Sequence, residues 1–101
     1  MADALPADAV IANTATLFSA LAHPGRLRIL LALSEKEPRT AGELAALASL
    51  EQTAASHQLR LLKKVRLITA SREGRQVLYR LSDHHISHIV RDAIAHVQEA
   101  S

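Results

Sequence analysis

The sequence predicts a mainly α-helical fold with one β-hairpin. Apolar spacing and helix-start signals indicate helices in five segments of the chain. Two β-prone segments flank the dipeptide Glu73-Gly74, where glycine supplies the positive φ of a hairpin turn. The 101 residues are 49% hydrophobic, which suits a single globular domain over residues 1–101.

Composition removes several classes of protein. The chain has no cysteine, which excludes disulfides, thiolate nucleophiles and cysteine-based zinc sites. No apolar run approaches the ~20 residues needed to cross a bilayer, so we expect no membrane partner. The acidic start lacks the basic stretch of a signal peptide, and we therefore expect a cytoplasmic protein.

The first two helices are expected over residues 8–21 and 26–34. His23-Pro24-Gly25 separates them, and Pro24 suits the first turn of the second helix. The apolar stripe of the first helix consists of Val10, Leu17, Phe18 and Leu21. The inward residues of the second are Leu27, Leu30 and Leu31.

A helix-turn-helix is predicted over residues 41–65. Thr40 and Glu43 have the spacing of a capping box, which begins a short helix over 41–48. A three-residue connection leads to a longer helix over 52–65, and two helices joined so tightly form this motif.

A wing and a last helix follow. Residues 67–72 and 76–81 form the predicted hairpin, a wing over 67–81 with Arg72 and Arg75 at its tip. Ser82 or Asp83 can cap a helix over 83–99. The order α-α-α-α-β-β-α is that of a winged helix-turn-helix domain with an extra helix at each end.

The net charge of +2 conceals a basic middle. Residues 52–82 carry a charge of +6, whereas the segments before and after carry −2 each. A concentrated basic segment is typical of a protein that binds nucleic acid. The alternative is a basic face that only meets solvent.

The helix over 52–65 has the side chains that DNA binding needs. Its polar residues share a sector of about 140° that contains no acid. Lysine and arginine neutralise phosphates, and Gln, Ser and Thr can bond base edges in the major groove. We expect DNA contacts from Gln52, Thr53, Ser56, His57, Arg60, Lys63, Lys64, Arg72 and Arg75. Gln58 instead projects into the apolar sector, either as a partly exposed edge residue or as a polar link to a neighbouring helix.

Metal-ligating residue types line one edge of the last helix. His85 and His96 lie about 16 Å apart along the axis, so one helix cannot bring both to one ion. Two antiparallel copies across a two-fold axis can. The spacing predicts two symmetric sites in a homodimer, each with Asp83 and His85 of one chain and His96 and Glu99 of its partner.

Other interpretations of this helix edge remain open. The residues can simply be solvated, and His84 with His88 forms a rival i, i+4 pair within one helix. His88 or Asp92 can join or replace a ligand of the main site. A small zinc hydrolase is a further candidate, but four protein ligands leave no open position for water.

The whole ordered set resembles the ArsR/SmtB family of winged-helix, metal-sensing repressors. The resemblance rests on the segment LAHPGRLRIL (residues 21–30), on ASHQLRLL (residues 55–62) and on the hairpin. Asp83, His85, His96 and Glu99 resemble the C-terminal-helix metal site of the zinc-sensing branch.

The resemblance implies a homodimer that represses an operator and releases it on binding metal. The absence of cysteine excludes the thiolate sites of some relatives, which leaves nitrogen and oxygen ligands that suit zinc, with cobalt or nickel as alternatives. We expect no enzyme activity. The expected dimer contacts are Val10, Leu17, Phe18, Ile86, Val90 and Val97. Gln58 is expected to couple the metal site to the DNA-reading helix. The alternative is a winged-helix repressor with structural or no metal and a different inducer.

Overall fold

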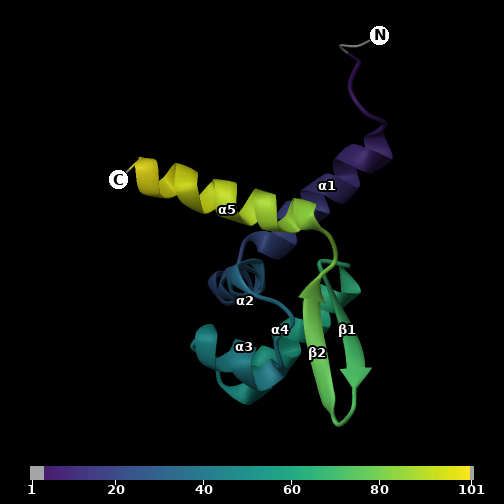
Figure 1. Ribbon diagram of the computed structural model, residues 1–101. Coiled ribbons are helices and arrows are strands. Elements are labelled where there is room, and N and C mark those ends of the chain that lie inside the picture. The colour runs from purple at the N-terminus through teal and green to yellow at the C-terminus, as the bar shows by residue number, and fades with distance from the viewer. Residues whose placement is uncertain (1–3, 101) are drawn as a thin grey trace.

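The computed structural model describes residues 4–100. Its elements are α1 (Asp8–Leu21), α2 (Pro24–Glu35), α3 (Ala41–Leu47), α4 (Gln52–Lys64), β1 (Ile68–Glu73), β2 (Gln76–Leu81) and α5 (His84–Glu99). The order α-α-α-α-β-β-α is confirmed. In Figure 1, α2, α3, α4 and the hairpin form the body, and α1 and α5 cross above it and diverge outward.

Helix α2 lies at the centre of the core and packs against α3, α4, α5 and β2. Ile29, Leu30 and Leu33 of this helix are almost fully buried. A helix that is apolar around most of its circumference is stable only when neighbours cover it on several sides. The other large core side chains are Leu21, Leu44, Leu59, Leu62, Leu67, Ile68, Ile86 and Val90.

Local caps fix where three helices begin. The ring of His23 accepts hydrogen bonds from the backbone N–H groups of Gly25 and Arg26, so α2 begins at Pro24, two residues before the predicted start. The capping box of Thr40 and Glu43 is present in both directions. Of the two candidate caps for α5, Asp83 is the one that accepts from the first turn.

The ends of α3 and α4 share one unusual feature. Ser49 (φ 56°) and Arg66 (φ 63°) follow these helices in the left-handed region. Leu50 N–H donates to Ala45 C=O and Leu67 N–H to Leu62 C=O, which is the Schellman pattern. Glycine is the usual residue at this position, so the side chains of both residues are tolerated at a cost in free energy.

The hairpin pairs Ile68 with Leu81 through to Glu73 with Gln76, one residue later on its first strand than predicted. Gly74 (φ 67°) opens the two-residue turn, as expected for glycine at a hairpin tip. Backbone hydrogen bonds also join Arg39 and Tyr79, which attaches the wing to the loop between α2 and α3. The sequence had not indicated that attachment.

Two of the six expected dimer contacts are buried within the single chain. Ile86 is 6% exposed and Val90 is 1% exposed within the single chain, because α5 packs this face against α2. They therefore have almost no surface left for a partner. Val10, Phe18 and Val97 are more than half exposed, and Leu17 is half-buried. Within residues 4–100, no helix has the length and apolar character that a bilayer crossing requires.

Candidate DNA-reading surface and metal ligands

Helix α4 presents a polar face to solvent and an apolar face to the core. Ala55, Leu59 and Leu62 are buried. The polar residues form what we call the reading face, and all are exposed except the half-buried Ser56: Gln52, Thr53, Ser56, His57, Arg60, Lys63 and Lys64. The short α3 packs against α4 on the side away from this face. This arrangement leaves the whole face free to enter a groove.

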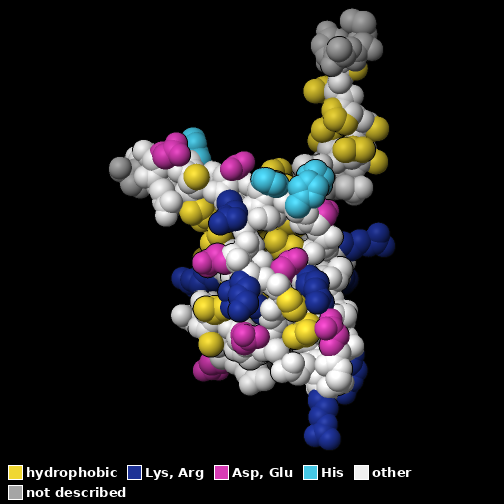
Figure 2. All heavy atoms as spheres, viewed as in Figure 1, with side chains coloured by type: hydrophobic (Ala, Val, Ile, Leu, Met, Phe, Trp, Pro, Cys, Tyr) yellow, Lys and Arg dark blue, Asp and Glu magenta, His cyan; other side chains and the backbone are white. Residues whose placement is uncertain are grey.

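The free end of the wing is basic. Arg72 and Arg75 are exposed beside the turn. In Figure 2 basic side chains project at the tip of the hairpin. A cationic tip at the end of a long hairpin suits contact with a phosphate backbone.

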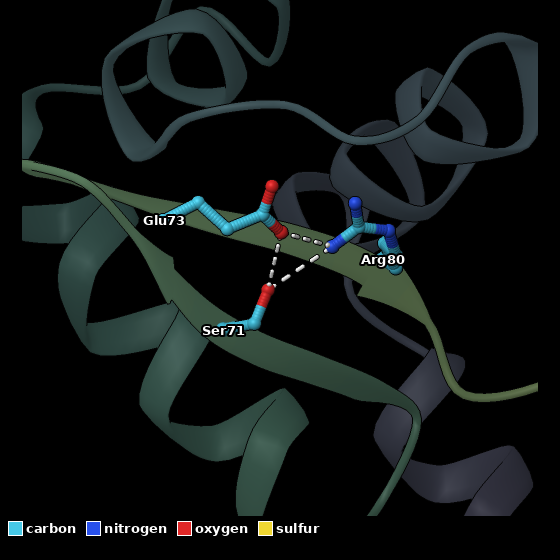
Figure 3. A network of polar contacts seen from close by, with 3 residues as sticks. All are labelled: Ser71, Glu73 and Arg80. Carbon is cyan, nitrogen blue, oxygen red and sulfur yellow. Dashed lines mark hydrogen bonds and ion pairs between the residues drawn. The ribbon is translucent and has the colours of Figure 1, made fainter.

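A polar network crosses the two strands of the wing (Figure 3). One nitrogen of Arg80 donates to Glu73 Oε2 and to Ser71 Oγ, both at 3.1 Å, and Ser71 Oγ donates to the same carboxylate oxygen at 2.9 Å. The hydrogen bond from Ser71, followed by the bond and charge of Arg80, lowers the pKa of Glu73 below its ordinary value. Glu73, the acidic residue within the basic segment of residues 52–82, is therefore favoured in its ionised form and is paired with Arg80.

Gln58 connects α4 to α2. Its side-chain oxygen accepts a hydrogen bond from Arg26 Nη1 at 3.3 Å, and Arg26 Nε donates to the C=O of Ala20 at 2.7 Å. Of the two interpretations of Gln58, the interhelical link is therefore present. The sequence had not indicated Arg26 as its partner.

The expected metal ligands lie at the two ends of α5, on its exposed side. His85, His96 and Glu99 are exposed, as is Asp83 at the cap. Figure 2 shows histidine side chains near the start of α5 and again toward its end, with acidic side chains between and beside them. Among residues 4–100 of this one chain, no three His, Cys, Asp or Glu side chains converge on a metal position.

The start of α5 is crowded with imidazoles. The ring of His84 lies 4.2 Å from that of His85 and 5.7 Å from that of His88, centroid to centroid. Asp83 uses Oδ1 to accept from His85 N–H at 2.9 Å and from Ile86 N–H at 3.3 Å. These two bonds orient the carboxylate of Asp83. Its second oxygen, Oδ2, does not take part in the cap. Nitrogen and oxygen donors of this kind fit a divalent first-row metal.

A helix-turn-helix followed by a wing, with a polar and basic helix face directed outward, defines a DNA-binding transcriptional regulator. The comparisons with known proteins agree. A family model described as a helix-turn-helix domain matches residues 21–69. The repressor SmtB of Mycobacterium tuberculosis is 46% identical over 83 residues, which cover 82% of this chain and 61% of SmtB. The regulator NmtR of the same species is 40% identical over 85 residues, covering 84% of this chain and 70% of NmtR.

Solved structures show the same likeness. The antimony-specific repressor AntR superposes with a TM-score of 0.84 at 30% identity, covering 96% of this chain and 87% of AntR. A homodimeric winged helix-turn-helix domain from Mycobacterium bovis superposes with a TM-score of 0.82 at 28% identity, covering 96% and 92%. The chain belongs to the ArsR/SmtB family of winged-helix regulators. This family and fold are those of DNA-binding regulators and not of enzymes. The chain spans about three fifths of the length of SmtB.

Proposed function

We propose that this protein is a homodimeric transcriptional repressor that leaves its operator on binding zinc at two sites between its subunits. The observation that carries the proposal is the placement of Asp83 with His85 at the start of α5 and of His96 with Glu99 at its end, all exposed. Relatives named as repressors support the rest.

The reading face of α4 and the tip of the wing are the proposed DNA contacts. Gln52, Thr53 and Ser56 lie in the first two turns of α4, where a recognition helix meets base edges. Arg60, Lys63, Lys64, Arg72 and Arg75 supply positive charge for phosphates. A dimer would place two such helices in successive major grooves, about one helical turn apart. Because an operator lies on chromosomal DNA, the proposal places the protein in the cytoplasm.

The terminal helices are the proposed dimer interface. Val10 and Phe18 of α1 are 51% and 54% exposed, and Val97 of α5 is 63% exposed. Large apolar side chains left uncovered on helices that project from the body mark an interaction surface. The M. bovis domain of the same fold is described as homodimeric. Leu17 completes the proposed surface, and Ile86 and Val90 are omitted from it.

In the proposed dimer, two antiparallel α5 helices bring the start of one against the end of the other. Asp83 and His85 of one chain would then hold the ion together with His96 and Glu99 of the partner subunit, and His88 lies close enough along the helix to replace a ligand. The bound metal supplies a cross-link of fixed geometry between the subunits. Four such ligands suit tetrahedral zinc, and cobalt or nickel would recruit the nearby histidines as further ligands.

A metal that fixes the two α5 helices relative to each other would change the affinity for DNA through α2, which lies between α5 and α4. Helix α5 packs on α2, and the hydroxyls of Ser87 and Ser34 are hydrogen-bonded at 2.9 Å. Helix α2 in turn bonds α4 through Arg26 and Gln58, which makes Gln58 the proposed coupling residue. If the metal-bound angle between the subunits misfits the operator, metal weakens DNA binding, and DNA weakens metal binding by the same factor.

The test begins with duplexes selected by the wild-type chain from random DNA. Their affinity is measured with and without zinc, cobalt and nickel. The proposal expects a fall of about fivefold or more with the sensed metal, since coupling energies are typically about 1–3 kcal/mol. An affinity that metal leaves unchanged would instead support a repressor with structural or no metal and another inducer.

Mixed dimers test the intersubunit geometry. His85→Ala and His96→Ala should each abolish zinc binding. A re-equilibrated equal mixture should recover roughly a quarter of the wild-type capacity, because half of the dimers then hold one intact site of two. His84→Ala serves as the matched control. No recovery in the mixture, or loss of zinc in the control, would favour the rival site of His84 and His88.

A further inference from the structure

We propose that Arg26 is a positioning residue that fixes the reading helix α4 against the C-terminal end of α1, and so sets the sequence selectivity of DNA binding. The inference rests on the proposed function, because it assigns a role within the DNA-reading unit. It adds a structural connection from α1 to the reading helix α4, beside the connection proposed from α5.

Arg26 contacts three helices at once. It belongs to the first turn of α2, its Nε donates to the carbonyl of Ala20 in the last turn of α1, and its Nη1 donates to Gln58 in the middle of α4. Guanidinium donates in a rigid fork, so the two bonds constrain each other's direction. A lysine at this position has one ammonium and does not reproduce the fork.

Two helix ends, the start of α2 and the end of α1, act on the charge of Arg26. A cation in the first turn of α2 meets the positive end of that helix dipole, which is unfavourable by itself. The same cation lies at the negative end of α1, where a last-turn carbonyl has no partner within the helix. The bond to Ala20 therefore offsets the unfavourable position, and it holds the guanidinium between α1 and α4.

The backbone at Arg26 is also fixed. His23 Nδ1 accepts from Gly25 N–H at 3.1 Å and from Arg26 N–H at 3.3 Å. The ring lies so close that a Cβ on Gly25 would meet His23 Cε1 at 3.1 Å. A side chain at residue 25 would therefore crowd the cap. The His23 cap therefore fixes the backbone position from which the Arg26 side chain extends.

A solvent-open groove separates α1 from α4. It has a volume of about 210 Å³ and is lined by Thr16, Ser19, Ala20, Arg26, Leu61 and Val65. Helix α4 packs against α2, α3 and β1, but the groove separates it from α1. The bonds of Arg26 supply a directional link across this groove, and we expect their loss to widen the range of orientations of α4 relative to α1.

This role separates selectivity from general affinity. Phosphate contacts depend on total charge and tolerate small shifts, whereas base contacts require the reading helix to hold one pose. Loss of Arg26 should therefore reduce the preference for the selected duplex more than it reduces binding to unrelated DNA. Loss of a solvated arginine should weaken both equally.

The experiment compares Arg26→Met, Gln58→Met, the double variant and Arg26→Lys with the wild-type chain. The control is Arg28→Met, which removes the same charge from an exposed position of α2. Each is titrated at one salt concentration with a selected duplex of about 24 bp, long enough for two half-sites, and with a scrambled duplex of the same composition. The ratio of the two affinities is the readout, and thermal melting checks folding.

We expect Arg26→Met to lower the ratio about tenfold, in keeping with the loss of a hydrogen bond from a charged donor. Arg26→Lys should fall between it and wild type. The double variant should lose no more than Arg26→Met alone, because the two residues share one bond. Arg28→Met should leave the ratio unchanged.

A ratio within twofold of wild type in a folded Arg26→Met protein would overturn the inference, as would equal losses in Arg26→Met and Arg28→Met. If Arg26→Met does not fold, Gln58→Met and Arg26→Lys decide by the same criterion. A wild-type chain that prefers no duplex overturns the proposed function itself, which is a distinguishable result.

Discussion

Arg80 is paired with Thr69 in the hairpin, yet its side chain reaches Glu73, with Nη1 of the arginine 3.1 Å from Oε2 of the glutamate. They lie on opposite strands of the hairpin, and Ser71 bonds the same carboxylate. Glu73 is the acid within the basic segment of residues 52–82. The pair therefore withholds one positive charge from a surface that is otherwise free to meet phosphates.

Replacing Glu73 by Gln should strengthen binding to duplex DNA of any sequence. The freed Arg80 can neutralise a further phosphate, and the slope of log affinity against log salt should steepen by about 1. Glu35→Gln on α2, equally a loss of one negative charge, is the control. Equal changes in both variants would show that only net charge matters.

Ser49→Gly should stabilise the chain by about 1 kcal/mol, because glycine adopts the left-handed conformation without the penalty of a Cβ. The control, Ala46→Gly, lies three residues earlier on an exposed position within α3 and should destabilise by about the same amount. Urea unfolding measures both. A loss of stability in Ser49→Gly would contradict the assignment of strain at this helix end.

The capping box of α3 should contribute stability that depends on pH. The N–H of Thr40, followed by its hydroxyl contact, lowers the pKa of Glu43 below its ordinary value. A carboxyl whose pKa is lower in the folded than in the unfolded chain stabilises above the unfolded pKa, and this contribution is lost as the pH falls through the folded pKa.

Unfolding of wild type and Glu43→Gln in urea, from neutral pH to pH ~3, tests this dependence. The difference between them should be largest near neutrality and should close in the acid range, below the ordinary glutamate pKa of about 4.3. Thr40→Ala removes the other half of the box and should destabilise by about 1 kcal/mol at neutral pH. A gap that stays constant with pH would show that the carboxylate's charge is irrelevant.

Val90→Ala and Phe18→Ser should have different effects, the first on the stability of the chain and the second on its self-association. Val90 is 1% exposed, so its truncation should destabilise the chain by about 2 kcal/mol through lost burial and a cavity. Phe18 is 54% exposed, and its replacement should leave monomer stability nearly unchanged while weakening self-association. Sedimentation measures association. Unaltered association in Phe18→Ser would argue against α1 as a dimer helix.

Much of the fold was predictable because its signals are local. The 3.6-residue period located all five helices within residues 4–100, and the Thr40–Glu43 spacing located the start of α3. Gly74 located the turn of the wing. Each signal operates within a few residues, where sequence distance and spatial distance are nearly the same.

Contacts between distant segments were not predictable in this way. Arg39 pairs with Tyr79, and Arg26 reaches both Ala20 and Gln58. The pattern also did not show that Ile86 and Val90 are buried within the single chain, where α5 packs on α2, because an apolar stripe does not specify what covers it.

The sequence by itself determined the order of elements, the polar face of α4 and the spacing of donors along α5, because each follows from local patterns of helical, β-prone and turn residues. Only the tertiary structure decided which neighbour covers each apolar stripe and that Gln58 is tied to Arg26. These depend on where separate helices meet, and that angle is set by packing across the whole core.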